Sequence, residues 1–525
     1  MMTQAEMSPI HSGTTSTRLA LDALRRSKER TVFRDGEREW SGGATLAAIG
    51  AMQAALERAG ARRGQRVALL CGNRTESWCI GVAAQALGLC ISWLHPLGSP
   101  QAHSFQVEDF GADLLVVDVP HYADLARFLD TEFSGRVRLL TLGPCDVGRD
   151  ILAGLGDESV TPVDRSAPDN LSLVNYTGGT TGRSKGAFRR ESALAASVVG
   201  VLADFDIARN PAFLAIGPIS HVTGTKIVPT LLRGGSVTML DRFDPDLVCS
   251  TIAARRIDMS LLVPTMIYSI LDSGALDRHD VSSLKLLLYG AAAMSPTRLA
   301  EGLDRFGPVF SQLYGQTECY PIAVLPREDH DVRFPERLAA CGFLSHMCDM
   351  RLLGPDGEPV AAGESGEICV RSPYAMEGYW NQPELTAEAF AGGWLHTGDV
   401  GRLDEDGRLY IVDRLKDMII TGGFNVYPRE VEDVISSLPG VSMVAVLGVP
   451  DPKWGEAVAA VIVPSAGAEL DPAMIMEAVK RRCGSVQAPK IVTFADTLPL
   501  TAAGKVDKKR LKAEGNLMPV TDAPQ

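Results

Sequence analysis

From Arg66 onward, short aliphatic runs alternate with segments of helical periodicity, and this alternation restricts the fold more than any other feature of the sequence. Strand-like runs such as RVALL, DLLVVD, VRLLTL and SVTML are separated by segments such as TESWCIGVAAQALGL and DPDLVCSTIAARR. Strands and helices that alternate in this way form parallel β-strands joined by crossover helices. The sequence therefore predicts an α/β fold for the large part of the chain.

The pattern changes in the second half of the chain. Between about 341 and 413, turn signals at 354–358 (GPDGE) and 404–408 (DEDGR) separate alternating runs, which is typical of a small β-barrel or ribbon layer. A new α/β pattern starts after Arg414 with REVEDVISSL and SMVAVLGV. Since single cores stop growing at roughly 250 to 300 residues, a chain of 525 residues holds two or more. We predict an N-terminal domain over 1–413 and a smaller domain over 414–525.

Composition and charge exclude several classes of protein. A net charge of −13 leaves no basic stripe for a nucleic acid. The longest apolar run, at 79–94, is shorter than the roughly 18 to 20 residues that span a bilayer and is interpreted as a buried helix. The N-terminus has no secretory signal, so a cytoplasmic location is expected, and 11–17 (HSGTTST) is interpreted as disordered. The ten cysteines form no C-x-x-C pair, which indicates buried free thiols and disfavours a metal pair at Cys341 and Cys348.

A glycine-rich loop at 176–187 (YTGGTTGRSKGA) follows the strand-like run LSLVN. Glycines directly after a strand let backbone N–H groups converge on an anion, and Lys185 adds a full positive charge. The loop is interpreted as a polyphosphate site, against the alternative of a plain glycine-rich turn. It is not a Walker-type loop, because Gly186 follows the lysine where that motif requires serine or threonine.

Further motifs follow the loop in order: PISHVTG at 218–224, YGQTE at 314–318, GWLHTGD at 393–399, YIVDRLKDMIITGGFNVYPREVE at 410–432 and LPLTAAGKVDK at 498–508. The whole set resembles the adenylate-forming superfamily, which contains acyl- and aryl-CoA synthetases, peptide-synthetase adenylation domains and firefly luciferase. The resemblance implies a large N-terminal domain of two α/β sheet layers plus a small β-barrel, and a smaller, mobile α+β C-terminal domain. It also implies that a carboxylate attacks the α-phosphorus of ATP to form acyl-AMP, and that a thiol then displaces AMP.

The resemblance further implies a role for each motif residue. Glu318 is expected to hold Mg²⁺, and Asp399 to accept both ribose hydroxyls. Arg414 is expected at the ribose and α-phosphate, and Lys505 at the transferring group, where it neutralises developing charge. The residues expected around the phosphates are Thr177, Gly178, Gly179, Thr180, Thr181, Gly182 and Lys185, and those around the adenine are Gly290, Ala291, Ala292, Gln312, Tyr314, Gly315, Gln316 and Thr317. The predicted catalytic set is Lys505, Glu318, His221 and Thr181.

The small domain is expected to complete the site by moving. Lys416 matches the hinge of the family, and rotation there would exchange the face with Lys505 for one with Gly422 and Gly423, which leave room for the pantetheine arm of CoA. Trp454 is a candidate to stack on the adenine of CoA. His221 lies either between the acyl pocket and the carboxylate or in the core, and we favour the first.

The chain departs from the family pattern at two places. Gly178 and Ser184 replace the usual serine and proline of the loop, and the lost hydroxyl weakens the grip on phosphate by about 1 kcal/mol. In the stretch GSVQAPK, residues 486–488 replace the aromatic and basic positions that grip CoA, and only Lys490 remains. Weak CoA affinity is therefore expected.

The predicted function is an AMP-forming carboxylic acid–CoA ligase that uses ATP, Mg²⁺ and CoA. No acid stands near PISHVTG to hold an ammonium, and the small residues of HVTGT and LYGAAAMS leave apolar volume, which favours a bulky hydrophobic or aromatic acid. Three alternatives stay open: an enzyme that passes acyl-AMP to a partner enzyme or carrier protein, a luciferase-type oxidation, and a non-catalytic nucleotide-binding relative. Monomer and homodimer are equally open.

Overall fold

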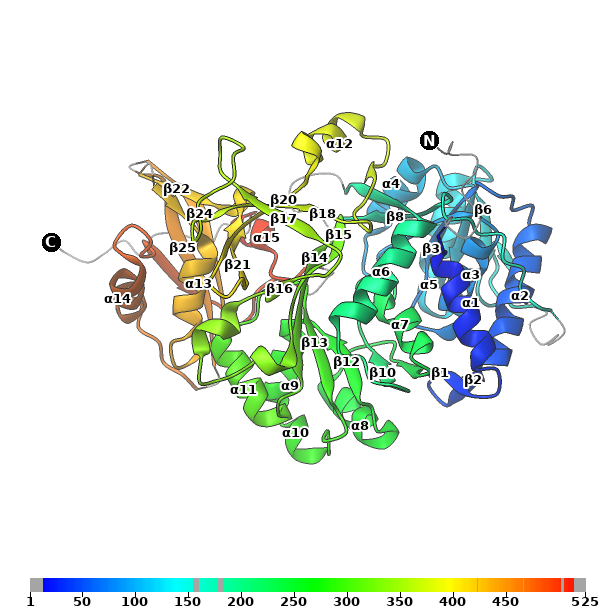
Figure 1. The fold of residues 1–525 in the computed structure, drawn as a ribbon, viewed down its shortest axis with the longest axis horizontal. Helices are drawn as coiled ribbons and strands as arrows, with labels where there is room; N and C mark the ends of the chain where they lie inside the picture. Colours follow the sequence, from blue (N-terminus) through cyan, green and yellow to red (C-terminus); the bar gives the residue numbers. More distant parts are fainter. Residues whose placement is uncertain are drawn as a thin grey trace, which may run out of the picture.

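The computed structural model of the chain describes residues 13–153, 160–177, 184–422, 424–452, 454–465, 467–501 and 505–513. Two large sheets lie next to each other in the N-terminal part, and a small C-terminal domain lies beside the second of them (Figure 1). This arrangement confirms the predicted α/β class with a large N-terminal and a smaller C-terminal domain.

The first sheet is parallel in its middle and antiparallel at one edge. Its strands, in spatial order, are β19 (Gly378–Tyr379), β9 (Gly186–Arg190), β8 (Leu171–Tyr176), β4 (Cys90–Trp93), β3 (Arg66–Leu70), β5 (Leu114–Val117), β6 (Arg138–Thr141) and β7 (Arg149–Asp150). Strands β8 to β7 run parallel, and the crossover helices are α3 (Thr75–Ala86), α4 (Pro100–Phe110) and α5 (Val119–Phe133). Every residue of β5 is buried, because helices cover both faces of such a sheet. The predicted glycine-rich loop connects β8 to β9, which are antiparallel neighbours.

The second sheet follows the same plan and ends in a hairpin that carries a predicted motif. Its order is β16 (Phe343–Leu344), β15 (Cys319–Leu325), β14 (Phe310–Gln316), β13 (Leu286–Gly290), β12 (Met259–Leu262), β10 (Ala212–Ala215), β11 (Ser236–Met239), β1 (Thr31–Asp35) and β2 (Arg38–Ser41). Its outer helices are α8 (Pro245–Arg255), α9 (Pro264–Ser273), α10 (Ala275–Arg278) and α11 (Pro296–Phe306). The antiparallel pair β14 and β15 holds the YGQTE motif at its turn.

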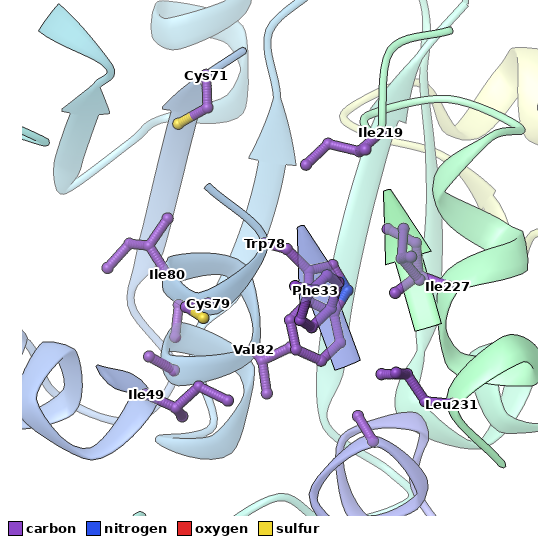
Figure 2. Close-up of a cluster of buried hydrophobic side chains, with 14 of the residues drawn as sticks. Phe33, Ile49, Cys71, Trp78, Cys79, Ile80, Val82, Ile219, Ile227 and Leu231 are labelled. Atoms are coloured by element: carbon purple, nitrogen blue, oxygen red, sulfur yellow. The ribbon is translucent and has the colours of Figure 1, made fainter. Parts of the chain in front are cut away.

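The two sheets share one hydrophobic core. Between them lie α1 (Ser16–Arg26), α6 (Glu191–Asp204) and α7 (Ile227–Leu232), as Figure 1 shows, and α2 (Gly42–Arg58) adds buried residues to the same core. In Figure 2, the ring of Phe33 on β1 lies against Trp78 on α3, with ring centroids 4.9 Å apart, and Ile227 and Leu231 of α7 approach from the opposite side. Burying each such side chain contributes about 1.5 to 3 kcal/mol, so this core holds the sheets in a fixed relation.

Two local predictions in the N-terminal domain are wrong. The apolar run 79–94 is not one helix, because α3 ends at Ala86, Gly88 turns the chain with φ +74°, and β4 begins at Cys90. An apolar run cannot by itself distinguish a buried helix from a buried strand. The described part of 11–17 is ordered structure: the hydroxyl of Thr15 accepts the N–H of Arg18 and caps α1.

The predicted barrel or ribbon layer is an antiparallel sheet in the order β17 (Asp349–Leu353), β18 (Gly366–Arg371), β20 (Leu395–Leu403) and β21 (Leu409–Arg414). Both predicted turns connect neighbouring strands, and Gly357 and Gly407 supply φ angles of +81° and +84° there. The sheet is an open ribbon and not the predicted small β-barrel, because Leu409 at the outer edge of β21 pairs with Gly342 instead of β17. Helix α12 (Pro383–Ala389) precedes β20.

The C-terminal domain has a core of its own. Its sheet contains β22 (Ile419–Thr421), β23 (Phe424–Val426), β24 (Val441–Asp451), β25 (Gly455–Pro464) and β26 (Ile491–Phe494), and its helices are α13 (Pro428–Ser436), α14 (Pro472–Cys483) and α15 (Lys508–Ala513). Buried residues of α13, α14 and the sheet, such as Val431, Ile475 and Ile462, form this core. The domain boundary at 413 and 414 remains a prediction.

Two sequence-level expectations can be checked against the whole fold. All ten cysteines are free, and eight of them are buried, as predicted; Cys145 and Cys483 are partly exposed. Across the described ranges, no helix combines the length and the apolar character that crossing a bilayer requires.

Candidate active site

A buried carboxylate, Asp399, lies where β20, β14 and β21 meet. Its side chain accepts hydrogen bonds from the Tyr314 hydroxyl at 2.8 Å and from the Gln316 amide at 2.6 Å. On its other oxygen it pairs with the Arg414 guanidinium at 3.0 Å. Burial and the Asp399 charge raise the pKa of Tyr314 well above its ordinary value, so the phenol stays a donor. Motifs from three separate parts of the sequence therefore converge on one carboxylate that is 3 % exposed.

Glu318 lies at the turn between β14 and β15, next to two groups that restrict it. The Tyr379 hydroxyl donates to its carboxylate at 2.8 Å, and its backbone carbonyl accepts from the N–H of Met376 at 2.7 Å. Lys185 approaches from the glycine-rich loop, with its ammonium 5.0 Å from the centre of the Tyr379 ring. A carboxylate held beside a lysine fits a hard cation such as Mg²⁺ together with phosphate oxygens.

The base of the glycine-rich loop is closed by hydrogen bonds. The N–H of Thr177 donates to the carbonyl of Lys185 at 2.8 Å, and the Ser184 hydroxyl donates to the carbonyl of Thr177 at 2.6 Å. Ser184, a departure from the family pattern, therefore joins the two ends of the loop. The other predicted loop residues, Gly178, Gly179, Thr180, Thr181 and Gly182, lie outside the described residues.

Lys505 of the small domain faces the carboxylates of the large domain. Burial and the Arg414 charge lower its pKa, Asp399 and Glu318 oppose the change, and the result is a pKa of about 8. Its own loop is closed by hydrogen bonds to Thr501, whose N–H donates to the Lys505 carbonyl at 2.6 Å. The structure thus brings the last predicted motif to the others, although more than one hundred residues separate Lys505 from Asp399 in the sequence.

His221 belongs to a histidine pair and lies close enough to Lys505 for the two charges to interact. Its ring and that of His95 meet edge to face, with centroids 4.6 Å apart, and its Nδ1 lies 2.8 Å from the Ser220 hydroxyl. Burial, followed by the charges of His95 and Lys505, lowers the pKa of His221 to about 3. Burial likewise lowers the pKa of His95 to about 4. Both imidazoles are therefore neutral near pH 7.

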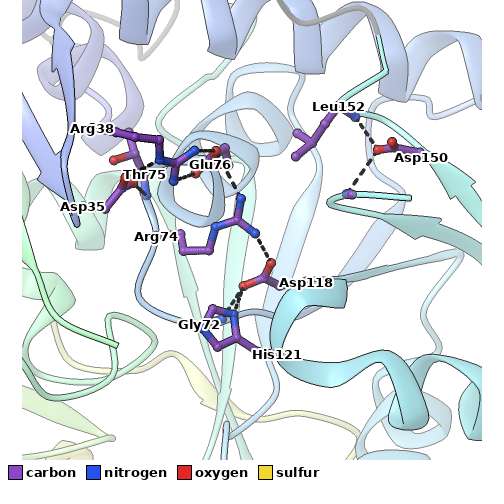
Figure 3. Close-up of polar contacts among 11 residues, drawn as sticks. Asp35, Arg38, Gly72, Arg74, Thr75, Glu76, Asp118, His121, Asp150 and Leu152 are labelled. Carbon is purple, nitrogen blue, oxygen red and sulfur yellow. Dashed lines mark hydrogen bonds and ion pairs between the residues drawn. The ribbon is translucent and has the colours of Figure 1, made fainter. Parts of the chain in front are cut away.

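The segment before His221 is fixed by Asn73. Its side-chain amide donates to the carbonyl of Gly217 at 2.9 Å and accepts the N–H of Ile219 at 3.0 Å. Asn73 is in turn placed by a polar network at the ends of β3 and β5, in which Arg74 lies between Glu76 and Asp118 (Figure 3). Asp118 has no exposed side-chain surface, so the network is a rigid support.

The remaining nucleotide candidates occupy the carboxyl end of the second sheet. Gly290 has no room for a Cβ, which would lie 2.2 Å from the Leu313 carbonyl, and Ala291 turns the chain with φ +63° before Ala292. The Gln312 side chain is 9 % exposed and bonds to Tyr289 and Cys341, so it belongs to the packing beneath the site. Its proposed contact with adenine remains a prediction.

The predicted thiol-side residues lie on the small domain. Burial and the Arg414 charge lower the pKa of Lys416. The N–H of Gly422 donates to the carbonyl of Trp454 at 2.8 Å, and Trp454 is 41 % exposed. Gly423 lies outside the described residues.

Sequence reasoning missed two residues that hold the site together. Arg189 of β9 is buried and donates to the carbonyls of Tyr374 and Thr317, so it fixes the YGQTE turn from below. Tyr379 restrains Glu318, as described above. Both residues act through contacts with segments far away in the sequence, so no local motif pointed to either.

A second cluster of ligand-type side chains supports the Asp399 loop. The Nδ1 of His396 lies 2.8 Å from Glu367 and 3.4 Å from the Cys369 sulfur. The other Glu367 oxygen accepts the N–H of Gly398, directly before Asp399. Both oxygens of Glu367 thus have partners within the protein. We assign the cluster to positioning of the Asp399 loop.

The chain matches known families along most of its length. Residues 21–380 match the family model described as "AMP-binding enzyme", and residues 430–505 match that of the "AMP-binding enzyme C-terminal domain". It is 42 % identical over 522 residues to medium/long-chain-fatty-acid–CoA ligase FadD8 of Mycobacterium tuberculosis, covering 96 % of this chain and 90 % of the relative. It is 38 % identical to feruloyl-CoA synthase of an Amycolatopsis species, covering 87 % and 90 %.

Solved structures extend the likeness to the fold. The amide bond synthetase McbA from Marinactinospora thermotolerans superposes with a TM-score of 0.88 and 33 % identity, covering 95 % of this chain and 100 % of that chain. ATP-bound MatB from Rhodopseudomonas palustris gives a TM-score of 0.86 and 29 % identity, covering 95 % and 99 %. With the converging motifs and both domain models matched, this chain belongs to the AMP-binding, adenylate-forming enzyme superfamily.

Proposed function

We propose that this protein is an AMP-forming carboxylic acid–CoA ligase. The observation that carries the proposal is the position of Lys505, a cation from the small domain that faces Asp399 and Glu318 of the large domain. A lysine whose charge interacts with two carboxylates across a domain boundary suits a reaction in which negative charge develops on a transferring phosphoryl group. The relatives named as CoA ligases support the same assignment.

The buried group around Asp399 is assigned to the nucleoside part of ATP. The carboxylate has two oxygens that can accept both ribose hydroxyls, and Arg414 holds its charge in place. Tyr314 presents an aromatic ring beside this carboxylate, where an adenine can stack. Since Gln316 donates to the same oxygen, it fixes the direction in which Asp399 points.

The phosphates are assigned to Lys185, the glycine-rich loop and Glu318. Glu318 would hold a Mg²⁺ ion, which would supply charge neutralisation to the phosphate oxygens. Lys185 beside Tyr379 would bind the leaving pyrophosphate by charge. Tyr379 keeps the Glu318 carboxylate oriented toward this region.

The chemistry then runs in two steps. An oxygen of the acid attacks the α-phosphorus, the bond to the β-phosphate oxygen breaks, and pyrophosphate leaves with that electron pair. Lys505, as an ammonium, stabilises the charge on the α-phosphate and on the incoming carboxylate. In the second step the sulfur of CoA attacks the acyl carbonyl, AMP leaves with the bonding electrons, and the thiol proton passes to water.

The second step requires the small domain to turn about Lys416. On the small domain, Ile420, Phe424 and Trp454 are 53 %, 62 % and 41 % exposed. These apolar side chains surround Gly422, so rotation would bury them against the large domain and stabilise the second conformation. In that conformation Gly422 would face the pantetheine arm.

A second candidate function is transfer of the acyl group from acyl-AMP to an acceptor other than CoA. Val486, Gln487 and Ala488 provide no charge for the phosphates of CoA, and Lys490 is used by its own loop, where it donates to the Ser485 carbonyl at 3.1 Å. The likeness to an amide bond synthetase favours an amine or a carrier-bound acceptor as the alternative.

The test is to follow both half-reactions with purified protein. ATP and a panel of fatty, cinnamic and arylacetic acids are supplied with and without CoA, and pyrophosphate, acyl-AMP and acyl-CoA are measured by mass spectrometry after rapid quench. The proposal requires pyrophosphate release that depends on the acid, followed by acyl-CoA. Acyl-AMP that accumulates in excess CoA, and is consumed by an added amine, would support the second candidate instead.

A further inference from the structure

Lys226 is a lysine with no exposed surface at all. It ends the short 3₁₀ turn η3 (Gly224–Lys226), which begins at the last residue of the PISHVTG motif and directly precedes α7. Lysine is almost never fully buried unless a charged partner accompanies it. The side chains around Lys226 therefore determine whether its burial is compensated.

The partners of the Lys226 ammonium are neutral. It lies 3.0 Å from the Thr225 hydroxyl and donates a hydrogen bond to the Tyr320 hydroxyl. The rings of Tyr320 and Phe205 lie 4.4 and 4.9 Å from it. Among the side chains in the described ranges, no carboxylate pairs with it, and the nearby Asp204 is engaged by His346 and Ser345.

Uncompensated burial of this kind is costly. Burial lowers the pKa of Lys226 well below its ordinary value, with no opposing carboxylate. Transfer of an unpaired ammonium from water into a protein interior costs several kcal/mol, whereas methionine would fill a similar volume without that cost. A residue that destabilises the fold at a site next to functional motifs is typical of a binding role.

Lys226 connects the segment proposed to line the acid pocket with the YGQTE turn. It follows His221 by five residues, and Tyr320 follows Glu318 by two. The Tyr320 ring lies directly on the YGQTE backbone, since a Cβ on Gly315 would be 2.7 Å from its Cδ2. The carbonyl of Tyr320 accepts the Ser197 hydroxyl of α6, which fixes the chain on the far side. The Lys226–Tyr320 pair therefore connects the residue after HVTGT, a segment proposed to line the acid pocket, with the turn that carries Glu318.

We propose that Lys226, which directly follows the segment HVTGT proposed to line the acid pocket, is a specificity-determining residue that binds a second hydrogen-bond acceptor at the end of the substrate far from the activated carboxylate. The inference rests on the proposed ligase function and names its substrate class: a hydrophobic acid that carries a distal carbonyl or carboxylate. The acceptor takes the place of the Tyr320 hydroxyl as partner of Lys226. A distal carboxylate would form an ion pair with the Lys226 ammonium and keep it charged. A distal ketone would accept a hydrogen bond from an N–H of Lys226.

The test compares matched acids that differ only in the distal group. The aliphatic series is octanoic acid, its methyl ketone analogue with the carbonyl next to the terminal methyl group, and octanedioic acid; the aromatic series is phenylpropanoic acid with its para-acetyl and para-carboxy analogues. Pyrophosphate release gives kcat/KM for each acid with the wild type, Lys226→Met, Lys226→Gln and Tyr320→Phe. Lys285→Met, at an exposed position, is the matched control.

The wild type and Lys285→Met should prefer an acceptor-bearing acid over its plain analogue by about 10-fold to 100-fold, since only the former gives the buried ammonium a stronger acceptor than the Tyr320 hydroxyl. Lys226→Met should reverse or abolish this preference and leave the KM for ATP unchanged. Lys226→Gln should retain the preference for the ketone and lose that for the diacid, which separates the two distal groups.

Each outcome decides between distinct conclusions. If the wild type releases pyrophosphate with plain acids at the same kcat/KM as with acceptor-bearing ones, Lys226 is a structural residue while the ligase function stands. The same conclusion follows if Lys226→Met folds and keeps the wild-type preference. If Lys226→Met does not fold, Lys226→Gln and Tyr320→Phe carry the comparison, and unchanged selectivity in both overturns the inference. If no acid supports pyrophosphate release, the proposed function itself fails.

Discussion

The two sides of the proposed site are built very differently. On the nucleotide side, Asp399 is almost completely buried and has partners from β14, β20 and β21. On the thiol side, Lys490 is exposed and its ammonium donates to the carbonyl of Ser485 in its own loop, and Trp454 is exposed as well. A charge that is buried with fixed partners acts strongly because water does not screen it, whereas an exposed charge contributes little. We therefore expect substitutions on the nucleotide side to affect acyl-AMP formation strongly, and substitutions on the thiol side to affect thioester formation only weakly.

The largest expected effect comes from Lys505, a cation that the small domain adds to the nucleotide side. Lys505→Ala should lower the rate of pyrophosphate release by at least about 100-fold, because charge at the transferring group loses its partner. Quenched-flow measurement of acyl-AMP formation checks this. Lys509→Ala, at an exposed position of the same segment, should leave the rate unchanged. If Lys505→Ala released pyrophosphate at nearly the wild-type rate, the nucleotide side would not be more sensitive to substitution than the thiol side.

The next effect concerns the buried carboxylate. Asp399→Ala should raise the KM for ATP by about 10-fold to 100-fold and change the KM for the acid little, because the carboxylate is assigned to ribose alone. It should also lower the thermal midpoint, since Arg414 is left without its partner. Steady-state kinetics and thermal unfolding test both points against Glu405→Ala, an exposed acid of the neighbouring turn. Equal changes in both KM values would show that the nucleotide and acyl sites are not separate.

The pH dependence of adenylation tests the role of Lys505 on the nucleotide side. Lys505 has a pKa of about 8, lowered by burial, so it is charged below that pH and loses its proton above it. The rate of adenylation should hence be constant from about pH 6 to 7.5 and fall toward tenfold per unit above about pH 8. His221, with a pKa of about 3, is neutral throughout this range and should add no further step. A single-turnover profile that stays flat beyond pH 9 would contradict the assignment of Lys505.

The smallest effect is expected on the thiol side. Gln487→Arg restores one positive charge near the predicted CoA phosphates, and one exposed charge contact is worth about 1 kcal/mol. The KM for CoA should fall about fivefold while pyrophosphate release without CoA is unchanged. Gln487→Glu is the matched control and should raise the KM for CoA. If both variants leave the KM unchanged, CoA does not pass over 486–490, and the second candidate function gains support.

The residues that sequence reasoning located and those that it missed differ in kind. Lys505, Asp399 and Glu318 stand in motifs, and a motif signals itself by residue type and spacing. Arg189, Tyr379 and Lys226 act through contacts with residues far away in the sequence, so no local pattern marks them. The prediction of one helix over 79–94 was wrong for a related reason. A buried helix and the buried strand that follows it have the same apolar content, so composition does not mark the boundary between them.

The sequence by itself determined the order of strands and helices and the superfamily, because periodicity and motif spacing are local properties of the chain. Only the tertiary structure decided that Asp399 has partners on β14 and β21, that Lys505 faces the large domain, and that Lys226 is buried with hydroxyl groups as its partners. Burial and charge pairing depend on which distant segments pack together. They set the pKa of Lys505 and the cost of Lys226, and neither quantity can be obtained from residues that are neighbours in sequence.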